Sequence, residues 1–415
     1  YSNSASNGCD IGADDFYPPI NIILDTFTVL YPTRYFAEAV DSQGFPIDGF
    51  FSYDIQNSII NPHNGDLYVN PIFGNDTNSG LSNNEPLKTI FHALSFIAED
   101  SVNKNTIYLA DGIYSDSSNN EKFPLNTRSN VRIKGQSMEN TILDGRNNSR
   151  IIKANNITSG FLYKNLKIQR GKYTDMPGAE GFLFYYGCQD FVLDSIILTQ
   201  HIGDVAGSIL GCHNFKIENF EVFNNTTQRS ALQISLNTHG IYDNDFTVSN
   251  SKFYANKAYT EDDWYIGGGL EFSGDSHWEM SDNFPVVINC LIEGNLRTGL
   301  RTEGLSKIYL VNSTIVNNGS FDDIYSNRFT WGIDAQIFNT IFYNNGDNEL
   351  YISNWDTDDT AYVEIYNSLI EGGEDNILVA QNGYLNYDET NIDEDPVFLN
   401  MWEHPFMISD GSPCI

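Results

Sequence analysis

Basic residues are scarce in this chain. Its 415 residues include 22 Lys and Arg against 55 Asp and Glu, which gives a formal charge of −33 at neutral pH. Nucleic-acid binding requires clustered cations and the release of counterions, and docking on anionic lipid requires a polybasic segment. We therefore expect neither nucleic acid nor an anionic membrane surface as a partner.

Long apolar runs and paired-cysteine motifs are also lacking. No run of about 18 apolar residues occurs, so we expect no membrane insertion. The five cysteines, at positions 9, 188, 212, 290 and 414, have neither a CxxC nor a Cys/His zinc spacing. The chain begins at Tyr1 without Met or a signal segment, which indicates a processed, exported protein or a fragment. The expected location is extracellular or on a cell surface.

One short phrase recurs from about residue 160 onward: a strand, then Asn or Asp, a small residue and an aliphatic one. Spacings of 23 to 39 residues between copies are typical of a constant structural turn decorated with loops of different length. We expect the marker side chains to stack along the axis as in Asn ladders, with Asn312 facing inward. The markers are Asn165, Asp194, Asn219, Asn250, Asn289, Asn312, Asn339 and Asn367.

A second phrase, such as 269–273 (GLEFS), alternates apolar and polar residues with a period of two and predicts a half-buried strand. These strands are too short to pair within one coil. Their backbone groups must therefore pair with the coils above and below, which makes the stacking parallel. Aligning the copies places Gln233, Glu271, Arg301 and Asp334 in one outward column.

The chain divides into two parts. Residues 67–415 carry the coils, with an amphipathic stretch near 86–100 that begins at Pro86 and predicts a helix covering the first coil. Residues 1–66 lack the repeat, and their alternating apolar stretches broken by prolines predict a β extension or a joining segment.

Several phrases occur in an order that identifies a known architecture. They are the strand and loop 67–80, the segment 86–90, the glycine turn 267–270, and the segments 391–398 and 410–415. With these motifs the chain resembles secreted right-handed parallel β-helix proteins of the pectin-lyase-like type, particularly prokaryotic surface proteins. The resemblance covers residues 67–415 and implies an all-β solenoid. It does not imply one activity, because one fold hosts many functions.

The end of the chain departs from that family. The closing motif 410–415 is usually followed by Asp-Ile-Gly-Ala, which here is found only near the start, at residues 10–13. The resemblance thus implies that the N-terminal segment of one copy completes the C-terminal end of the next, locked by Cys9 and Cys414. The alternatives are a fragment boundary within a longer tandem protein and an unconnected similarity between the two segments.

The sequence offers two candidate chemical sites, a charged column and a pair of acidic loops. We expect Glu271, Arg301 and Asp334 to form a surface salt-bridge ladder. The alternative is that they form a sugar-binding or hydrolytic patch with paired carboxylates. The acidic loops 356–359 and 393–395 offer oxygen ligands to Ca²⁺, but neither has the spacing of a calcium loop, so we expect no cofactor.

Glycosylation sequons are plentiful. The candidate acceptors are Asn75, Asn147, Asn156, Asn224, Asn225 and Asn318. Asn312 also lies in a sequon, but its expected inward position would leave it unmodified.

These observations favour a non-catalytic, extracellular structural or adhesive surface protein that assembles head-to-tail with copies of itself into a layer, sheath or filament. Extracellular glycans are a further expected partner. The alternative is a carbohydrate-active enzyme, a polysaccharide lyase or glycoside hydrolase, using Glu271, Arg301 and Asp334. A third interpretation is a glycan-binding module with exposed Tyr and Trp.

Overall fold

The computed structural model describes residues 21–25, 35–40, 53–55, 62–155, 158–172, 178–185, 187–235, 245–259, 267–274, 285–304, 307–319, 326–354, 360–399, 401 and 406–415. The chain divides into two compact units, Tyr1–His63 and Asn64–Ile415. In the first unit, strands β1 (Asn21–Asp25), β2 (Tyr35–Val40) and β3 (Tyr53–Ile55) form an antiparallel sheet. Cys9 and residues 10–13 lie outside the described residues.

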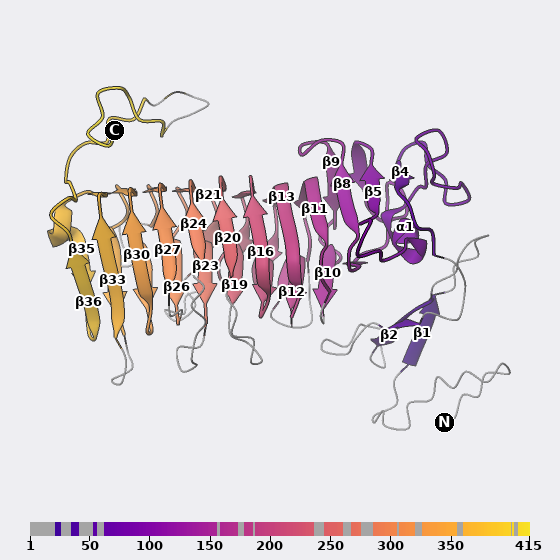
Figure 1. Ribbon diagram of the computed structural model, residues 1–415, viewed down its shortest axis with the longest axis horizontal. Helices are drawn as coiled ribbons and strands as arrows, with labels where there is room; N and C mark the ends of the chain where they lie inside the picture. Colours follow the sequence, from indigo (N-terminus) through magenta and orange to yellow (C-terminus); the bar gives the residue numbers. More distant parts are fainter. Residues whose placement is uncertain are drawn as a thin grey trace. The chain divides into compact units, whose positions relative to one another are not determined.

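The second unit is a parallel β-helix, which confirms the predicted fold class (Figure 1). One side is a ten-stranded parallel sheet, in which each strand pairs with its counterpart in the next coil. Its strands are β7 (Leu125–Asn126), β10 (Ile152–Asn155), β12 (Ala179–Tyr185), β15 (Val205–Leu210), β19 (Leu232–Ser235), β23 (Gly268–Ser273), β26 (Thr298–Glu303), β29 (Arg328–Thr330), β32 (Leu350–Ser353) and β35 (Ile377–Val379).

The remaining sides form a second parallel sheet, here called the wrapped sheet because it bends around the core at a turn in each coil. Its strands are β4 (Leu67–Val69), β5 (Thr106–Leu109), β6 (Gly112–Tyr114), β8 (Arg132–Gly135), β9 (Thr141–Asp144), β11 (Leu162–Gln169), β13 (Gln189–Thr199), β16 (His213–Glu218), β17 (Glu221–Phe223), β20 (Phe246–Ser249), β21 (Lys252–Tyr254), β24 (Val286–Ile288), β25 (Leu291–Glu293), β27 (Ile308–Val311), β28 (Thr314–Val316), β30 (Asp334–Phe338), β31 (Ile341–Tyr343), β33 (Ala361–Tyr366), β34 (Leu369–Ile370) and β36 (Gly383–Tyr387). A short third sheet contains β14 (Ile202–Gly203), β18 (Thr226–Thr227) and β22 (Lys257–Ala258).

The marker residues make the turn within the wrapped sheet. Asn250, for example, joins β20 to β21 with a φ of 50°, a left-handed conformation that Asn tolerates better than most residues. The stacking of marker side chains occurs in part: the amide of Asn339 donates to that of Asn312 at 3.1 Å. Both side chains are exposed, so the expectation that Asn312 faces inward is wrong.

The buried asparagine ladder lies six residues after the markers. Its members are 0–1% exposed and are Asn225, Asn256, Asn295, Asn318 and Asn345. The backbone N and the Nδ2 of Asn256 both donate to Oδ1 of Asn295, at 3.2 and 2.9 Å, and Asn295 repeats this pattern with Asn318. Each amide also donates to a backbone carbonyl, so the ladder ties successive coils together without leaving a buried donor unpaired.

Stacked aromatic rings fill part of the core. The rings of Phe161, Phe191, Phe215 and Phe246 follow one another at centroid distances of 4.7, 4.9 and 4.9 Å and are nearly parallel. Identical side chains at one position of successive coils must stack, because adjacent strands are about 4.8 Å apart.

The predicted capping helix is α1 (Ile90–Phe96), which packs against β4 and β5. Thr89 caps it by accepting a hydrogen bond from His92 N at 3.1 Å, and the buried carboxylate of Glu121 accepts from the amides of Ile90 and Phe91 at 2.9 Å each. The first coil is thereby closed: Leu67 is fully buried. A 3₁₀ turn, η3 (Gly373–Asn376), precedes β35.

Replacing a ladder residue should be costly. In Asn295→Ala, two buried donors of Asn256 lose their acceptor, so we expect the free energy of unfolding in urea to fall by roughly 3 kcal/mol. Asn83→Ala, at an exposed position, is the control and should change it by less than about 0.5 kcal/mol. Equal effects of the two substitutions would contradict a structural role for the ladder.

Candidate functional site

The predicted charged column lies on the outer face of the ten-stranded sheet, with Arg328 in the position predicted for Asp334. The strand register places Gln233 opposite Glu271, Glu271 opposite Arg301, and Arg301 opposite Arg328. Asp334 belongs instead to β30 of the wrapped sheet, so its place in the column was wrong. The sequence around Asp334 has the same alternating pattern as the other copies, but Asp334 is the first residue of β30, a strand of the wrapped sheet.

The carboxylate of Glu271 is held on three sides. Ser230 Oγ donates to its Oε2 at 2.8 Å, Gln233 Nε2 donates to its Oε1 at 3.0 Å, and Arg301 Nη1 lies 3.8 Å from Oε2. The other terminal nitrogen of Arg301 pairs with Glu303, so one guanidinium bridges two carboxylates.

This column is buried rather than half-exposed. Glu271 is 3% and Arg301 7% exposed, so neither offers an open catalytic cleft. Burial raises the pKa of Glu303, and Arg301 offsets part of that rise. The cluster combines acidic and basic groups, but both carboxylates are already paired with the same guanidinium.

Removing the shared cation should therefore destabilise the fold. In Arg301→Ala the buried Glu271 and the largely buried Glu303 lose the guanidinium that they share, and we expect a loss of about 3–5 kcal/mol in unfolding free energy near pH 8. The loss should shrink in acid, because burial raises the pKa of Glu303 and its carboxyl becomes protonated there. Thermal denaturation across pH measures both effects, and Lys252→Ala, which breaks a half-exposed pair with Glu221, should cost less than about 1 kcal/mol.

Asp334 lies on a different surface, which we call the tyrosine face. It occupies the outer side of β30, β33 and β36, three strands that lie side by side in Figure 1. Its members form three rows across these strands: Asp334, Tyr362 and Tyr384; Gln336, Glu364 and Asn386; Phe338 and Tyr366.

The tyrosine face combines open rings with fixed polar groups. Tyr362 is 47% and Tyr384 51% exposed, and their ring centroids are 5.3 Å apart. Glu364 accepts hydrogen bonds from Gln336 at 3.0 Å and from Asn386 at 3.3 Å. Flat apolar rings beside an ordered row of amides and a carboxylate suit a ligand that has both apolar faces and hydroxyl groups.

Glu180 is a buried carboxyl group that the sequence pattern does not predict. Glu180 in β12 is 1% exposed, and its Oε1 accepts from Asp204 N at 2.7 Å, while Oε2 has no partner among the described residues. Burial raises the pKa of Glu180 to about 8, so the group is mostly neutral near pH 7. Arg229 binds Asp204 with two bonds of 3.0 Å and so is not available to Glu180. Nothing in the repeat pattern distinguishes Glu180 from an exposed strand residue.

The described residues contain no group of three His, Cys, Asp or Glu side chains that could hold a metal ion. The loop 356–359 lies entirely outside the described ranges. In the loop 393–395, Asp393 and Asp395 accept hydrogen bonds from backbone amides of Gly372 and Val397 at 2.8 Å each.

The candidate glycosylation sites differ in whether the folded chain buries or exposes them. Asn225 and Asn318 belong to the buried ladder, so the folded chain gives a glycosyltransferase no access to either. The exposed candidates are Asn75, Asn147 and Asn224; Asn156 lies outside the described residues.

Cys414, the other half of the expected disulfide, is a half-buried free thiol, and burial raises its pKa. It lines a groove of about 710 Å³ between the C-terminal segment and the turns of the last coils. Its pairing with Cys9 stays a prediction, because Cys9 is outside the described residues.

Residues 72–165 match a family described as a protein of unknown function, DUF1565. No curated protein matches the chain. Among the described residues no helix is long and apolar enough to cross a membrane.

Solved structures with similar architecture include carbohydrate-active proteins. Pectate lyase Pel9A has 12% identity over 85% of this chain and 91% of that one, with a TM-score of 0.44. XylC in complex with xylose has 8% identity over 76% and 70%, with a TM-score of 0.47. The tailspike gp49 of Acinetobacter baumannii bacteriophage Fri1, a capsular polysaccharide depolymerase, has 13% identity over 72% and 60%, with a TM-score of 0.39. At these values, function has to be argued from this chain's own residues.

Proposed function

We propose that this chain is a non-catalytic adhesive protein of the cell surface that binds glycans on its tyrosine face. The observation that carries the proposal is the pair of half-exposed rings, Tyr362 and Tyr384, beside the bonded row of Gln336, Glu364 and Asn386. Sugar rings have an apolar face that packs on aromatic rings and hydroxyls that bond to amides and carboxylates.

The geometry of the strands supports an extended ligand. Successive coils rise by about 4.8 Å, which is close to the length of one pyranose unit, so successive strands can contact successive sugars. The side chains are positioned by backbone pairing from β30 to β36 and need little reordering, which lowers the entropic cost of binding.

Binding is favoured over catalysis because the charged column is buried and mutually neutralised. A glycosidase needs two carboxyl groups flanking the bond to be cleaved, one of them able to donate a proton. Glu271 and Glu303 share Arg301 instead. The carbohydrate-active enzyme remains the second candidate for the tyrosine face itself, since burial raises the pKa of Asp334 there, as expected of a proton donor.

Truncating the rings tests the proposal. The double variant Tyr362→Ala, Tyr384→Ala should lose about tenfold or more in affinity for xylan or mixed-linkage glucan oligosaccharides, because each stacked ring contributes on the order of 1 kcal/mol. The measurement is isothermal titration calorimetry with the intact chain. Tyr259→Ala removes a ring of similar exposure, 46%, from another side and should leave the affinity unchanged.

Two results would count against binding by the tyrosine face. One is equal affinity for the double variant and the Tyr259→Ala control. The other is that the unmodified chain cleaves the oligosaccharides and releases new sugar ends, whereas Asp334→Asn does not. That result would show that the chain is an enzyme.

Self-assembly is a separate proposal, carried by the last coil. Val379 occupies the inward column of the ten-stranded sheet, where Ile352 of the preceding coil is fully buried. Val379 is 40% exposed, because within the described ranges no strand pairs with the far edge of β35. The first coil is covered by α1, so the two ends of the core differ. A second copy that stacks on the last coil would bury Val379 and pair the free edge of β35.

Charging that end should prevent stacking. Val379→Asp is expected to shift sedimentation from assemblies to single chains, whereas Ile113→Asp, which alters an exposed side chain at 46% on a first coil, should not. Single chains for the unmodified protein at concentrations up to about 1 mM, a weak limit for association, would contradict this proposal.

A further inference from the structure

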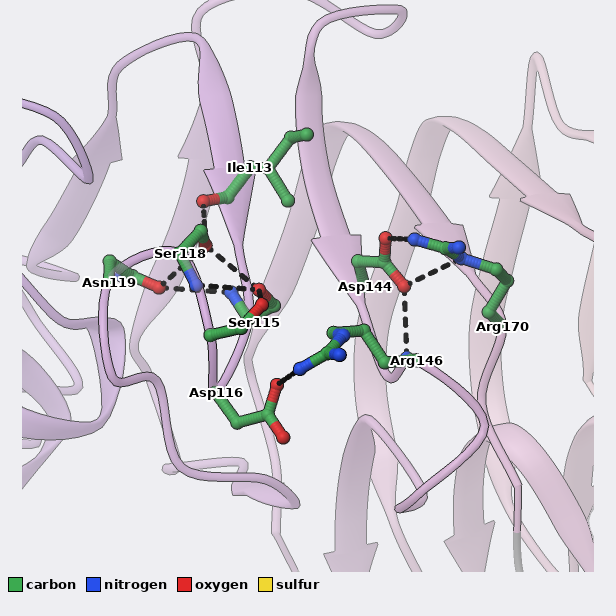
Figure 2. Close-up of polar contacts among 9 residues, drawn as sticks. Ile113, Ser115, Asp116, Ser118, Asn119, Asp144, Arg146 and Arg170 are labelled. Carbon is green, nitrogen blue, oxygen red and sulfur yellow. Dashed lines mark hydrogen bonds and ion pairs between the residues drawn. The ribbon is translucent and has the colours of Figure 1, made fainter.

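Side chains link neighbouring coils at several places in this β-helix. Figure 2 shows one such link near the start of the helix, an ion pair of 2.9 Å between Arg146 and Asp116. The buried asparagine ladder provides others further along. Between these two regions, one corner of two successive coils holds a pair of buried thiols, those of Cys188 and Cys212.

The two cysteines occupy equivalent positions of their coils. Cys188 immediately precedes β13 and Cys212 immediately precedes β16, and these two strands pair in parallel. The pairing continues across the corner, because Gly187 N donates to the carbonyl of Gly211 at 2.9 Å and His213 N donates to that of Cys188 at 3.1 Å. Hydrogen bonds on both sides thus hold the two Cα atoms near the coil spacing of about 4.8 Å, within the span of roughly 4.4–6.8 Å that a disulfide bridges.

The two thiols also point the same way. Cys188 Sγ donates to the carbonyl of Tyr185, and Cys212 Sγ donates to that of Leu210, at 3.5 Å in both cases. These two carbonyls lie opposite each other in the register of β12 and β15. Burial, followed by a hydrogen bond with the Cys188 thiol, raises the pKa of Cys212 well above its usual value. One sulfur therefore lies directly above the other.

Cys290 provides a contrast in the same core. It is 3% exposed, and the strand register places it between Ser251 and Ser313 of the neighbouring coils. All three side chains donate to the backbone carbonyl two residues earlier, so Cys290 occupies a position in which serine fits equally well. Its neighbours in the column are hydroxyls, whereas Cys188 and Cys212 have each other.

We propose that Cys188 and Cys212 are a modification site, at which the chain forms a disulfide between successive coils. The oxidant is a small disulfide such as oxidised glutathione. One cysteine thiolate attacks it and releases one glutathione thiol, and the second thiolate then attacks this mixed disulfide and releases another. One S–S bond forms and one breaks, while the two electrons and two protons of the cysteine thiols end on glutathione.

Burial decides when this exchange takes place. The attacking species is the thiolate, and an apolar core disfavours that form and excludes the oxidant. The bond therefore forms while the coils are closing, and the finished core then shields it from reductants. The site depends neither on the tyrosine face nor on stacking of copies, so its failure would leave both of those proposals untouched.

The direct test synthesises the intact chain in a cell-free system that contains reduced and oxidised glutathione, and then blocks free thiols by alkylation. Cleavage before aspartate residues separates Cys188 and Cys212 into the segments 175–189 and 204–242. We expect mass spectrometry to find these two segments linked in about 90% or more of the chains, because structural disulfides resist the glutathione pool. Recovery of both segments alkylated and separate, or linkage of Cys188 mainly to another cysteine, would overturn the proposal.

The second test compares thermal unfolding of chains synthesised with glutathione and with dithiothreitol. The disulfide closes a loop of 212 − 188 = 24 residues, and by restricting the unfolded chain it should raise the midpoint by roughly 5 °C. Cys188→Ser should unfold at the same temperature in both preparations. The matched control Cys290→Ser, which also removes one buried thiol, should keep the full difference.

Three results of the thermal comparison would contradict the proposal. They are equal midpoints for the two preparations of the unmodified chain, a difference that persists in Cys188→Ser, and a difference that disappears in Cys290→Ser. The peptide analysis needs no substitution, so it decides the matter even where Cys188→Ser does not fold.

Discussion

Backbone pairing between coils is the constraint on which the rest of this structure depends. Every strand of the second unit is too short to be stable alone and is parallel to its partners, so its N–H and C=O groups are satisfied only by the coils on either side. The buried asparagine ladder extends the same principle to the turns. Asn225 through Asn345 link five coils with side-chain bonds that replace the missing backbone partners.

That constraint also explains the surface. Because each coil repeats the position of the one before, an outward column becomes a row of side chains at nearly constant spacing. The same column of the wrapped sheet carries Tyr108 and Lys134 on the first coils and Phe338 and Tyr366 on the last. One scaffold can therefore present different side chains at equivalent positions along one face without any change in backbone. What each part of such a surface can bind therefore depends on which residues occupy the equivalent outward positions of successive coils.

Electrostatics act locally on this scaffold. The charge of −33 is spread unevenly, because residues 122–172 hold 11 Lys and Arg against two acidic residues. The charged column on the ten-stranded sheet instead holds its charges in ion pairs that are largely buried. Arg301 is valuable there because Glu271 and Glu303 cannot be solvated, which is a structural reason and not a catalytic one.

The sequence by itself determined the repeat, the parallel pairing, the capping helix near 86–100 and the column from Gln233 to Arg301, because these depend on local periodicity and on short-range hydrogen-bonding needs. Only the tertiary structure decided what each repeated position faces. It moved Asp334 to another side of the coil, exposed Asn312 and buried Asn318, and placed Lys134 against Lys164. Loops of unequal length hide the register between coils, and burial depends on contacts between residues some 25 positions apart that periodicity within one strand does not contain.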